Sequence, residues 1–278
     1  MSGVVLSQIL SGWRRTRSLC LAAERRVWCG GTVKMRWPFV AAGRKIVTLP
    51  LGGGLDGQLH GTHYFAMIKN LFFDMGGVVF RQNSQEAYRR FREAGIDPAQ
   101  YMGDYGQRGF FLDVETGRID AAAFCRKMAA AAGRDSVSFA EAQHCWLGYV
   151  VDVPVGRLHR LLELRRDYRV CLLSNTNPFI MDYMRSERFS DDRRPITDYF
   201  DRLFCSYEMH AYKPDAAIFR QALSADGLSA EESVFIDDSR KNVDAAAALG
   251  FKTLHVTANA DWTGALNTLL AKGACAKL

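Results

Sequence analysis

The chain has 278 residues, of which 48% are hydrophobic and 24% charged, as in an ordinary soluble globular protein. No run approaches the roughly 18 apolar residues of a membrane-spanning helix, so the sequence predicts no membrane segment. The net charge of +6 comes from residues 1–66, which hold nine basic and two acidic residues, whereas residues 67–278 hold 27 basic and 28 acidic ones. The near-neutral globular part therefore argues against a nucleic-acid partner.

The first 66 residues show no sustained hydrophobic period, and residues 51–61 are rich in glycine. We expect this basic segment to be disordered. Arginine-rich, acid-poor leaders include organelle transit peptides, but we favour a mis-assigned start, with translated upstream sequence before a natural start at Met67.

From Met67 onward, strand-like and helix-like patterns alternate, which is typical of a parallel sheet with crossover helices. Apolar runs that suit strands covered on both faces occur at 69–74, 169–174, 202–206, 233–237 and 252–256. The sequence therefore predicts an α/β fold, with a Rossmann-like parallel sheet and helices on both faces.

The interval between the first two predicted strands is too long for a simple crossover, and its pattern is helical. It includes a capping box formed by Ser138 and Glu141. We expect residues 82–160 to form an inserted α-helical cap on a core of residues 67–81 and 161–278.

Seven cysteines are scattered along the chain without a Cys-x-x-Cys pair. Cys171 and Cys205 lie inside apolar, strand-like runs. This pattern is typical of reduced thiols in the core of a cytoplasmic protein, and it predicts neither a zinc site nor a disulfide framework.

Four short segments place polar residues at strand ends, where an open α/β sheet gathers its ligands. They are Asp74-Met75-Gly76-Gly77, Ser174-Asn175, Lys213-Pro214 and Asp237-Asp238. Each segment alone is also typical of a turn or a helix start. The four together favour a phosphate site.

The residue types in these segments fit phosphoryl transfer. Asp74, at the tip of a buried strand, can attack phosphorus and form an aspartyl-phosphate. Ser174 and Asn175 can donate hydrogen bonds to the phosphoryl oxygens, and Lys213 supplies positive charge. Asp74 and Asp238 offer the hard oxygen ligands that Mg²⁺ prefers.

In order and spacing, the four segments resemble the motifs of the haloacid dehalogenase-like hydrolase superfamily, over residues 67–260. The resemblance implies that Asp74, the main-chain carbonyl of Gly76 and Asp238 hold Mg²⁺, and that Asp237 is a partner of Lys213. It also implies a small phosphorylated metabolite as the substrate.

Gly76 departs from the usual pattern of this superfamily, in which a second Asp protonates the leaving oxygen and then activates water. Acid–base help is worth roughly 10²–10⁴ in rate. Three interpretations stay open: a phosphatase that relies on another group, a metal-independent dehalogenase, and a non-catalytic phosphate-binding domain. The Asp237-Asp238 pair argues against the dehalogenase, and the intact remaining motifs argue against the non-catalytic domain.

An Asp-x-Gly first motif, Ser-Asn-Thr-Asn at 174–177 and an Asp-Asp fourth motif resemble a phosphatase subgroup that includes enzymes of the α-D-glucose-1-phosphate phosphatase type. We therefore expect a Mg²⁺-dependent phosphatase that hydrolyses a small phosphomonoester, a sugar phosphate by resemblance, through an aspartyl-phosphate. The sequence leaves open which group handles the proton in place of an acid at Gly76.

Overall fold

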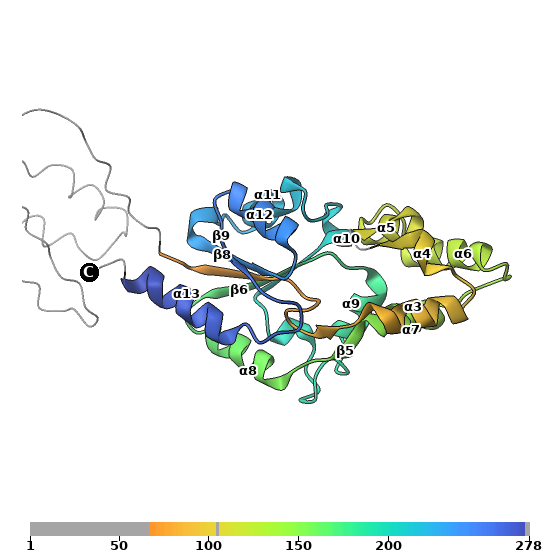
Figure 1. Cartoon of the computed structure of the whole chain (residues 1–278), viewed down its shortest axis with the longest axis horizontal. Coiled ribbons are helices and arrows are strands. Elements are labelled where there is room, and N and C mark those ends of the chain that lie inside the picture. Colours follow the sequence, from red (N-terminus) through yellow and green to blue (C-terminus); the bar gives the residue numbers. More distant parts are fainter. Residues whose placement is uncertain (1–66, 104–105, 276–278) are drawn as a thin grey trace, which may run out of the picture. The chain divides into compact units, whose positions relative to one another are not determined.

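The computed structural model describes residues 67–103 and 106–275, and the expected leader at 1–66 lies outside them (Figure 1). None of the helices in this described part is long and apolar enough to cross a membrane. The described chain forms a sheet covered by helices and a separate group of helices beyond one end of the sheet (Figure 1).

The sheet has five parallel strands in the order β7-β6-β1-β8-β9. They are β1 (Asn70–Phe73), β6 (Arg169–Ser174), β7 (Arg202–Cys205), β8 (Ser233–Asp237) and β9 (Lys252–His255). Each lies within one residue of its predicted bounds at either end, because the apolar runs are buried. The predicted α/β fold with a parallel sheet is confirmed.

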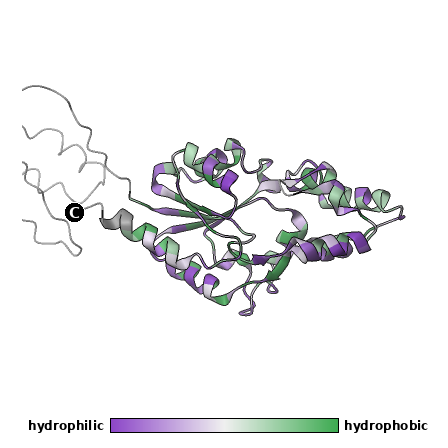
Figure 2. Cartoon of the chain, viewed as in Figure 1, coloured by the Kyte–Doolittle hydropathy of each residue, from purple (hydrophilic) through white to green (hydrophobic). Residues whose placement is uncertain are grey.

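Helices cover both faces of this sheet (Figure 1). Helices α8 (Val155–Leu164) and α13 (Thr263–Cys275) lie on one face, and α11 (Ala216–Ala225) and α12 (Arg240–Ala248) on the other. Alternate residues of β1 divide between two apolar clusters: Phe73 packs in one with Leu161 of α8, and Phe72 in the other with Phe219 of α11. Hydrophilic residues are interspersed along these helices, as expected when each helix buries a single face (Figure 2).

A group of helices is inserted between β2 (Arg81–Gln82) and β5 (Val150–Asp152), which pair antiparallel. It contains α3 (Ser84–Glu93), α4 (Pro98–Tyr101), α5 (Gly109–Glu115), α6 (Ala121–Ala131), α7 (Phe139–Trp146), the 3₁₀ turn η1 (Leu147–Tyr149) and the short strands β3 (Met102–Gly103) and β4 (Gly106–Gln107). We call this group the helical region.

A cluster of aromatic rings forms the centre of the helical region. Phe111 contacts Phe91, Phe124 and Trp146 with ring centroids 4.8–5.2 Å apart. Helix α8, by contrast, packs against β6 of the sheet. The boundary expected at residue 160 therefore falls inside a core helix, and we propose that the helical region ends at β5 instead.

The remaining short elements lie between β6 and β8 in the chain. They are α9 (Pro178–Met184), η2 (Ile196–Asp198), α10 (Ser206–Met209) and η3 (Ala230–Glu232). Since all five strands of the sheet run parallel, their carboxyl ends meet at one edge, and in Figure 1 the helical region lies beyond that edge.

Candidate active site

Strand β1 delivers Asp74 to the carboxyl edge of the sheet, where a glycine turn follows. The Asp74 main-chain N–H donates to the carbonyl of Ile236 on β8 at 2.9 Å, which fixes the strand tip. Gly77 has φ +74°, and a Cβ atom on it would overlap the carboxylate of Asp238. Glycine at this position therefore lets the turn and Asp238 approach each other.

Lys213 lies at the centre of the site, with 1% of its side chain exposed. Its Nζ donates to Oδ1 of Asp74 and to Oδ2 of Asp237, at 2.7 Å in each case. The ammonium group thus joins the tips of β1 and β8, and the contact with Asp237 agrees with the pairing that the family resemblance implied.

Asn175 holds the main chain of Lys213 from both sides. Its Oδ1 accepts from the Lys213 main-chain N–H at 2.8 Å, and its Nδ2 donates to the Lys213 carbonyl at 2.9 Å. The side chain that the sequence assigned to phosphate binding is therefore engaged in positioning Lys213. The neighbouring Ser174 is buried at the end of β6, and its hydroxyl donates to the carbonyl of Asn175 at 3.3 Å.

The two carboxylates that follow β8 have different surroundings. Asp237 is fully buried, and besides Lys213 it accepts from the Ser239 main-chain N–H at 2.7 Å and from the Asn242 amide at 3.1–3.2 Å. Asp238 is only partly buried and has a long contact, 3.4 Å, with the amide of Gln82. Asp238 is thus the freer of the two to take an additional ligand.

Three carboxylates face a single ammonium group at this site. One ligand atom each from Asp74, Asp237 and Asp238 lies within 4.8 Å of the others. Burial raises the pKa of Asp74 to about 7, with Lys213 opposing the rise and the other two carboxylates adding to it. Burial and Asp237 likewise raise the pKa of Asp238 to about 6. The excess negative charge and the oxygen ligands fit a divalent cation such as Mg²⁺.

A cavity of about 170 Å³ opens beside Asp74, and both the core and the helical region line it. Four other predicted site residues are part of its lining: Gly76, Ser174, Asn175 and Lys213. The sequence interpretation did not include the other polar residues that line it, which are Gln82, Gln107, Glu115, Tyr149, Tyr212 and Asn242.

Glu115, at the last position of α5, is the buried acid of this lining, with 5% of the residue exposed. The hydroxyl of Tyr212 donates to its Oε2 at 2.9 Å. Burial raises the pKa of Glu115 to about 7, against the opposing effects of Tyr212 and Asn177. In the sequence, Glu115 stands among other acids of a helical stretch, and no local motif distinguishes it.

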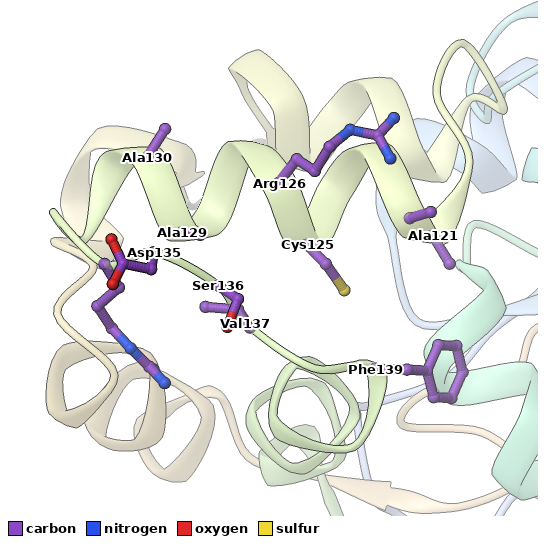
Figure 3. A pocket seen from close by; sticks show the side chains of 11 residues that line it. Ala121, Cys125, Arg126, Ala129, Ala130, Asp135, Ser136, Val137 and Phe139 are labelled. Carbon is purple, nitrogen blue, oxygen red and sulfur yellow. The ribbon is translucent and has the colours of Figure 1, made fainter.

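A larger hollow of about 620 Å³ lies on the helical region, between α6 and residues 134–139 (Figure 3). Its lining includes Cys125, Val137 and Phe139, and none of the predicted site residues. The candidate active site is therefore the smaller cavity, where the charged groups meet.

The chain resembles known phosphatases over most of its length. A D-ribitol-5-phosphate phosphatase of Bacteroides thetaiotaomicron is 35% identical over 205 residues, which cover 73% of this chain and 99% of that protein. A sesquiterpene phosphatase of Aspergillus oryzae is 26% identical over 205 residues, covering 68% of this chain and 90% of that protein.

Solved structures agree with these relatives. A protein described as a predicted HAD-like family hydrolase from Porphyromonas gingivalis is 35% identical with a TM-score of 0.70, and the match covers 74% of this chain and 98% of that one. A HAD family enzyme from Bacteroides thetaiotaomicron, in complex with magnesium and inorganic phosphate, is 33% identical with a TM-score of 0.65 and coverage of 71% and 98%. Residues 68–250 also match the family model for haloacid dehalogenase-like hydrolases. The chain therefore belongs to the haloacid dehalogenase-like hydrolase family.

Proposed function

We propose that the protein is a Mg²⁺-dependent phosphatase that hydrolyses a small polyol or sugar phosphate through an aspartyl-phosphate. The observation that carries the proposal is the arrangement of Asp74, Lys213 and Asp238 at the tip of the central strand. Asp74 attacks the phosphorus atom, and the P–O bond to the leaving group breaks. Water then hydrolyses the aspartyl-phosphate and releases inorganic phosphate.

The positive charge of Lys213 orients Asp74 and balances the negative charge that gathers on the phosphoryl oxygens. Asp74, Asp238 and the main-chain carbonyl of Gly76 would hold Mg²⁺, which when bound neutralises further charge on the phosphoryl group. Asp237 is not a metal ligand in this scheme, because its oxygens already accept hydrogen bonds from Lys213, Ser239 and Asn242. Its role is to hold Lys213 in place.

Ser174 and the main-chain N–H groups of the Gly76-Gly77 turn bind the phosphoryl oxygens. Asn175 supports this group indirectly, because its side chain fixes the main chain of Lys213. The relatives that are phosphatases, and the neighbour crystallised with magnesium and phosphate, support a Mg²⁺-dependent phosphatase activity.

The lining of the cavity supports a hydroxyl-rich leaving group. Nε1 of Trp146 and Oε1 of Gln107 are buried and have no hydrogen-bond partner among the described residues. Both residues line the cavity, together with Tyr149 and Tyr212. Buried donors and acceptors without partners destabilise a protein unless a ligand satisfies them. Hydroxyl groups of a polyol or sugar phosphate would satisfy them, and a prenyl chain would not.

The test is a substrate panel on the full chain, with ribitol 5-phosphate, several sugar phosphates and a prenyl phosphate. Each is assayed with Mg²⁺ and with EDTA, and phosphate release is measured. We expect Mg²⁺-dependent turnover, with kcat/KM at least tenfold higher for a polyol or sugar phosphate than for the prenyl phosphate. Asp74→Asn should abolish turnover of every substrate, as the matched control for the nucleophile.

Turnover that persists in EDTA would favour a metal-independent hydrolase. Binding of phosphate without turnover of any substrate would favour a non-catalytic phosphate-binding domain. Retained activity in Asp74→Asn would contradict the assignment of the nucleophile.

A further inference from the structure

The place beside Gly76, where a second acid would stand, is occupied by Gln82. A Cβ atom on Gly76 would lie 2.5 Å from Oε1 of Gln82. The Gln82 main chain is fixed there, because its N–H donates to Oδ1 of Asn259 at 2.7 Å and its carbonyl accepts from Nδ2 of the same residue at 3.0 Å. A carboxamide does not donate a proton as an acid, so another group must supply the proton that the leaving oxygen takes up.

Within the described part of the chain, the carboxyl groups that line the cavity come from Asp74 and Glu115. Asp74 forms the bond to phosphorus and cannot also serve as the acid. The ammonium group of Lys213 is held by two carboxylates. Among the residues that the structure describes, only Glu115 combines a carboxyl group, a place in this lining and freedom from the nucleophilic and charge-balancing roles.

We propose that Glu115 of the helical region is the general acid and base of the reaction, and that it takes the role of the carboxyl group that Gly76 lacks. The proposal rests on the proposed function and deepens it. In the first step Asp74 Oδ attacks phosphorus, the bond to the leaving oxygen breaks with its electron pair, and the protonated Glu115 gives its proton to that oxygen. The products are the free alcohol, the aspartyl-phosphate and the Glu115 carboxylate.

In the second step water attacks the phosphorus of the aspartyl-phosphate. A proton passes from the water to the Glu115 carboxylate, and the P–O bond to Asp74 breaks, which returns the electron pair to the Asp74 carboxylate. Inorganic phosphate leaves, and Glu115 is protonated again. No additional co-reactant is needed.

The surroundings of Glu115 suit a group that must exchange its proton near neutral pH. It faces the uncharged side chains of Tyr212, Tyr149 and Asn177. Helix α10 also packs against α5, but its acid Glu208 is paired with Arg185 at 2.7 Å. Position at the C-terminal end of a helix further disfavours a carboxylate. The rise in the pKa of Glu115 to about 7 agrees with this geometry.

Because Glu115 belongs to α5, the reaction depends on the helical region. A core without that region would keep the nucleophile and Lys213 but would lack the proton donor. Because an aryl phosphate with a nitrophenol leaving group needs no proton, and an alkyl phosphate does, the two substrates separate the acid role of Glu115 from a role in binding or folding.

The experiment measures Glu115→Gln in the full chain with Mg²⁺, using p-nitrophenyl phosphate and an alkyl phosphate that the wild type hydrolyses. We expect kcat for the alkyl phosphate to fall by about 10²–10⁴-fold. The pre-steady-state release of nitrophenol should fall less than about tenfold, followed by slow turnover, since the second step also needs the base. The wild-type loss of kcat for the alkyl phosphate as pH rises through about 7 should be absent in the variant.

Two variants serve as controls. Glu115→Asp keeps a carboxyl group and should restore part of the alkyl phosphate activity. Tyr212→Phe removes the larger of the two interactions that lower the pKa of Glu115, so it should move the alkaline limb of the wild-type pH profile to higher pH.

A pre-steady-state release of nitrophenol that falls as much as kcat for the alkyl phosphate, or an unchanged kcat for the alkyl phosphate in Glu115→Gln, would overturn the proposal while the phosphatase assignment stands. If the wild type releases phosphate from p-nitrophenyl phosphate and from every alkyl phosphate of the substrate panel at no measurable rate, the proposed function itself is wrong. Circular dichroism of each variant distinguishes these results from a failure to fold.

Discussion

Asn175 and Lys213 are joined by two reciprocal hydrogen bonds, one from the Lys213 main-chain N–H to the Asn175 amide oxygen and one from the Asn175 amide nitrogen to the Lys213 carbonyl. The two residues are 38 positions apart: Asn175 directly follows β6, and Lys213 lies in the loop after α10. These two hydrogen bonds fix the main chain of Lys213, whose buried ammonium group donates to Asp74. The position of the positive charge of Lys213 therefore depends on Asn175, which is uncharged.

Asn175→Ala should reduce kcat by about 10–100-fold, because Lys213 would no longer be held against Asp74. Loss of the two buried hydrogen bonds should also lower the free energy of unfolding by about 1–3 kcal/mol. Ser174→Ala is the comparison, because it should raise the inhibition constant of inorganic phosphate with little change in stability. Steady-state kinetics and urea denaturation measure both effects. A higher inhibition constant in Asn175→Ala, with unchanged stability, would assign its side chain to phosphate binding instead.

Lys213→Met should abolish turnover and destabilise the protein. The substitution leaves the carboxylates of Asp74 and Asp237 buried without their shared counter-charge, and removal of one partner of a buried ion pair costs about 3–5 kcal/mol. Urea denaturation at pH 8 measures this loss. The double variant Lys213→Met with Asp237→Asn should recover part of it, because one of the uncompensated charges is gone. Strictly additive effects of the two substitutions would show that the lysine and Asp237 are not coupled.

An aspartate at position 76, close to Asp74, should take over the proposed proton transfer of Glu115. The backbone of Gly76 does not have a positive φ, and Oε1 of Gln82 is the atom closest to an added Cβ. In the Glu115→Gln background, Gly76→Asp together with Gln82→Ala should raise kcat for an alkyl phosphate by about tenfold or more, a part of what acid–base help is worth.

The matched control carries Gly76→Asn in place of Gly76→Asp, which has nearly the same shape but no acidic proton. Equal recovery with asparagine would mean that the space, and not the proton, limits the reaction. No recovery in either variant, with folding intact by circular dichroism, would count against a shared role for the two positions.

Much of the core was predictable because its determinants are local. The apolar runs of β1, β6 and β8 identify buried strands, and parallel strands bring their carboxyl ends to one edge. Asp74 and the Asp237-Asp238 pair therefore come together without any knowledge of the loops. The contact between Lys213 and Asp237, which the family resemblance implied, is present at 2.7 Å.

The other features depend on contacts between distant parts of the chain. The Asn175 side chain pairs with the main chain of Lys213, 38 positions further along the chain, and no pattern near Asn175 encodes this contact. Glu115 reaches the cavity through the docking of the helical region onto the core, and Gln82 is held there by Asn259, which lies 177 positions further along the chain. The pattern of an amphipathic helix shows which face is buried, but not which polar residue at its end meets a nucleophile more than 40 residues before it in the chain.

Glu115→Gln should stabilise the protein at alkaline pH and much less at acidic pH. The folded-state pKa of Glu115, about 7, is above its ordinary value of 4.5, so the folded protein holds this proton more tightly than the unfolded chain. Below pH 4.5 the Glu115 carboxyl is protonated in both the folded and the unfolded state, so it does not lower the free energy of unfolding. Between pH 4.5 and about 7 the unfolded chain releases this proton while the folded protein keeps it, so stability falls, and above pH 7 the loss reaches about 3 kcal/mol, which glutamine avoids.

The measurement is urea denaturation of variant and wild type at pH 5 and pH 8.5. The difference in the free energy of unfolding should grow with pH in favour of the variant. Glu187→Gln is the control, because 68% of that side chain is exposed and its substitution should change stability by less than about 0.5 kcal/mol at either pH. A difference between variant and wild type that stays constant from pH 5 to pH 8.5 would show that Glu115 is not held protonated by burial, and it would remove the electrostatic support for its role as the acid.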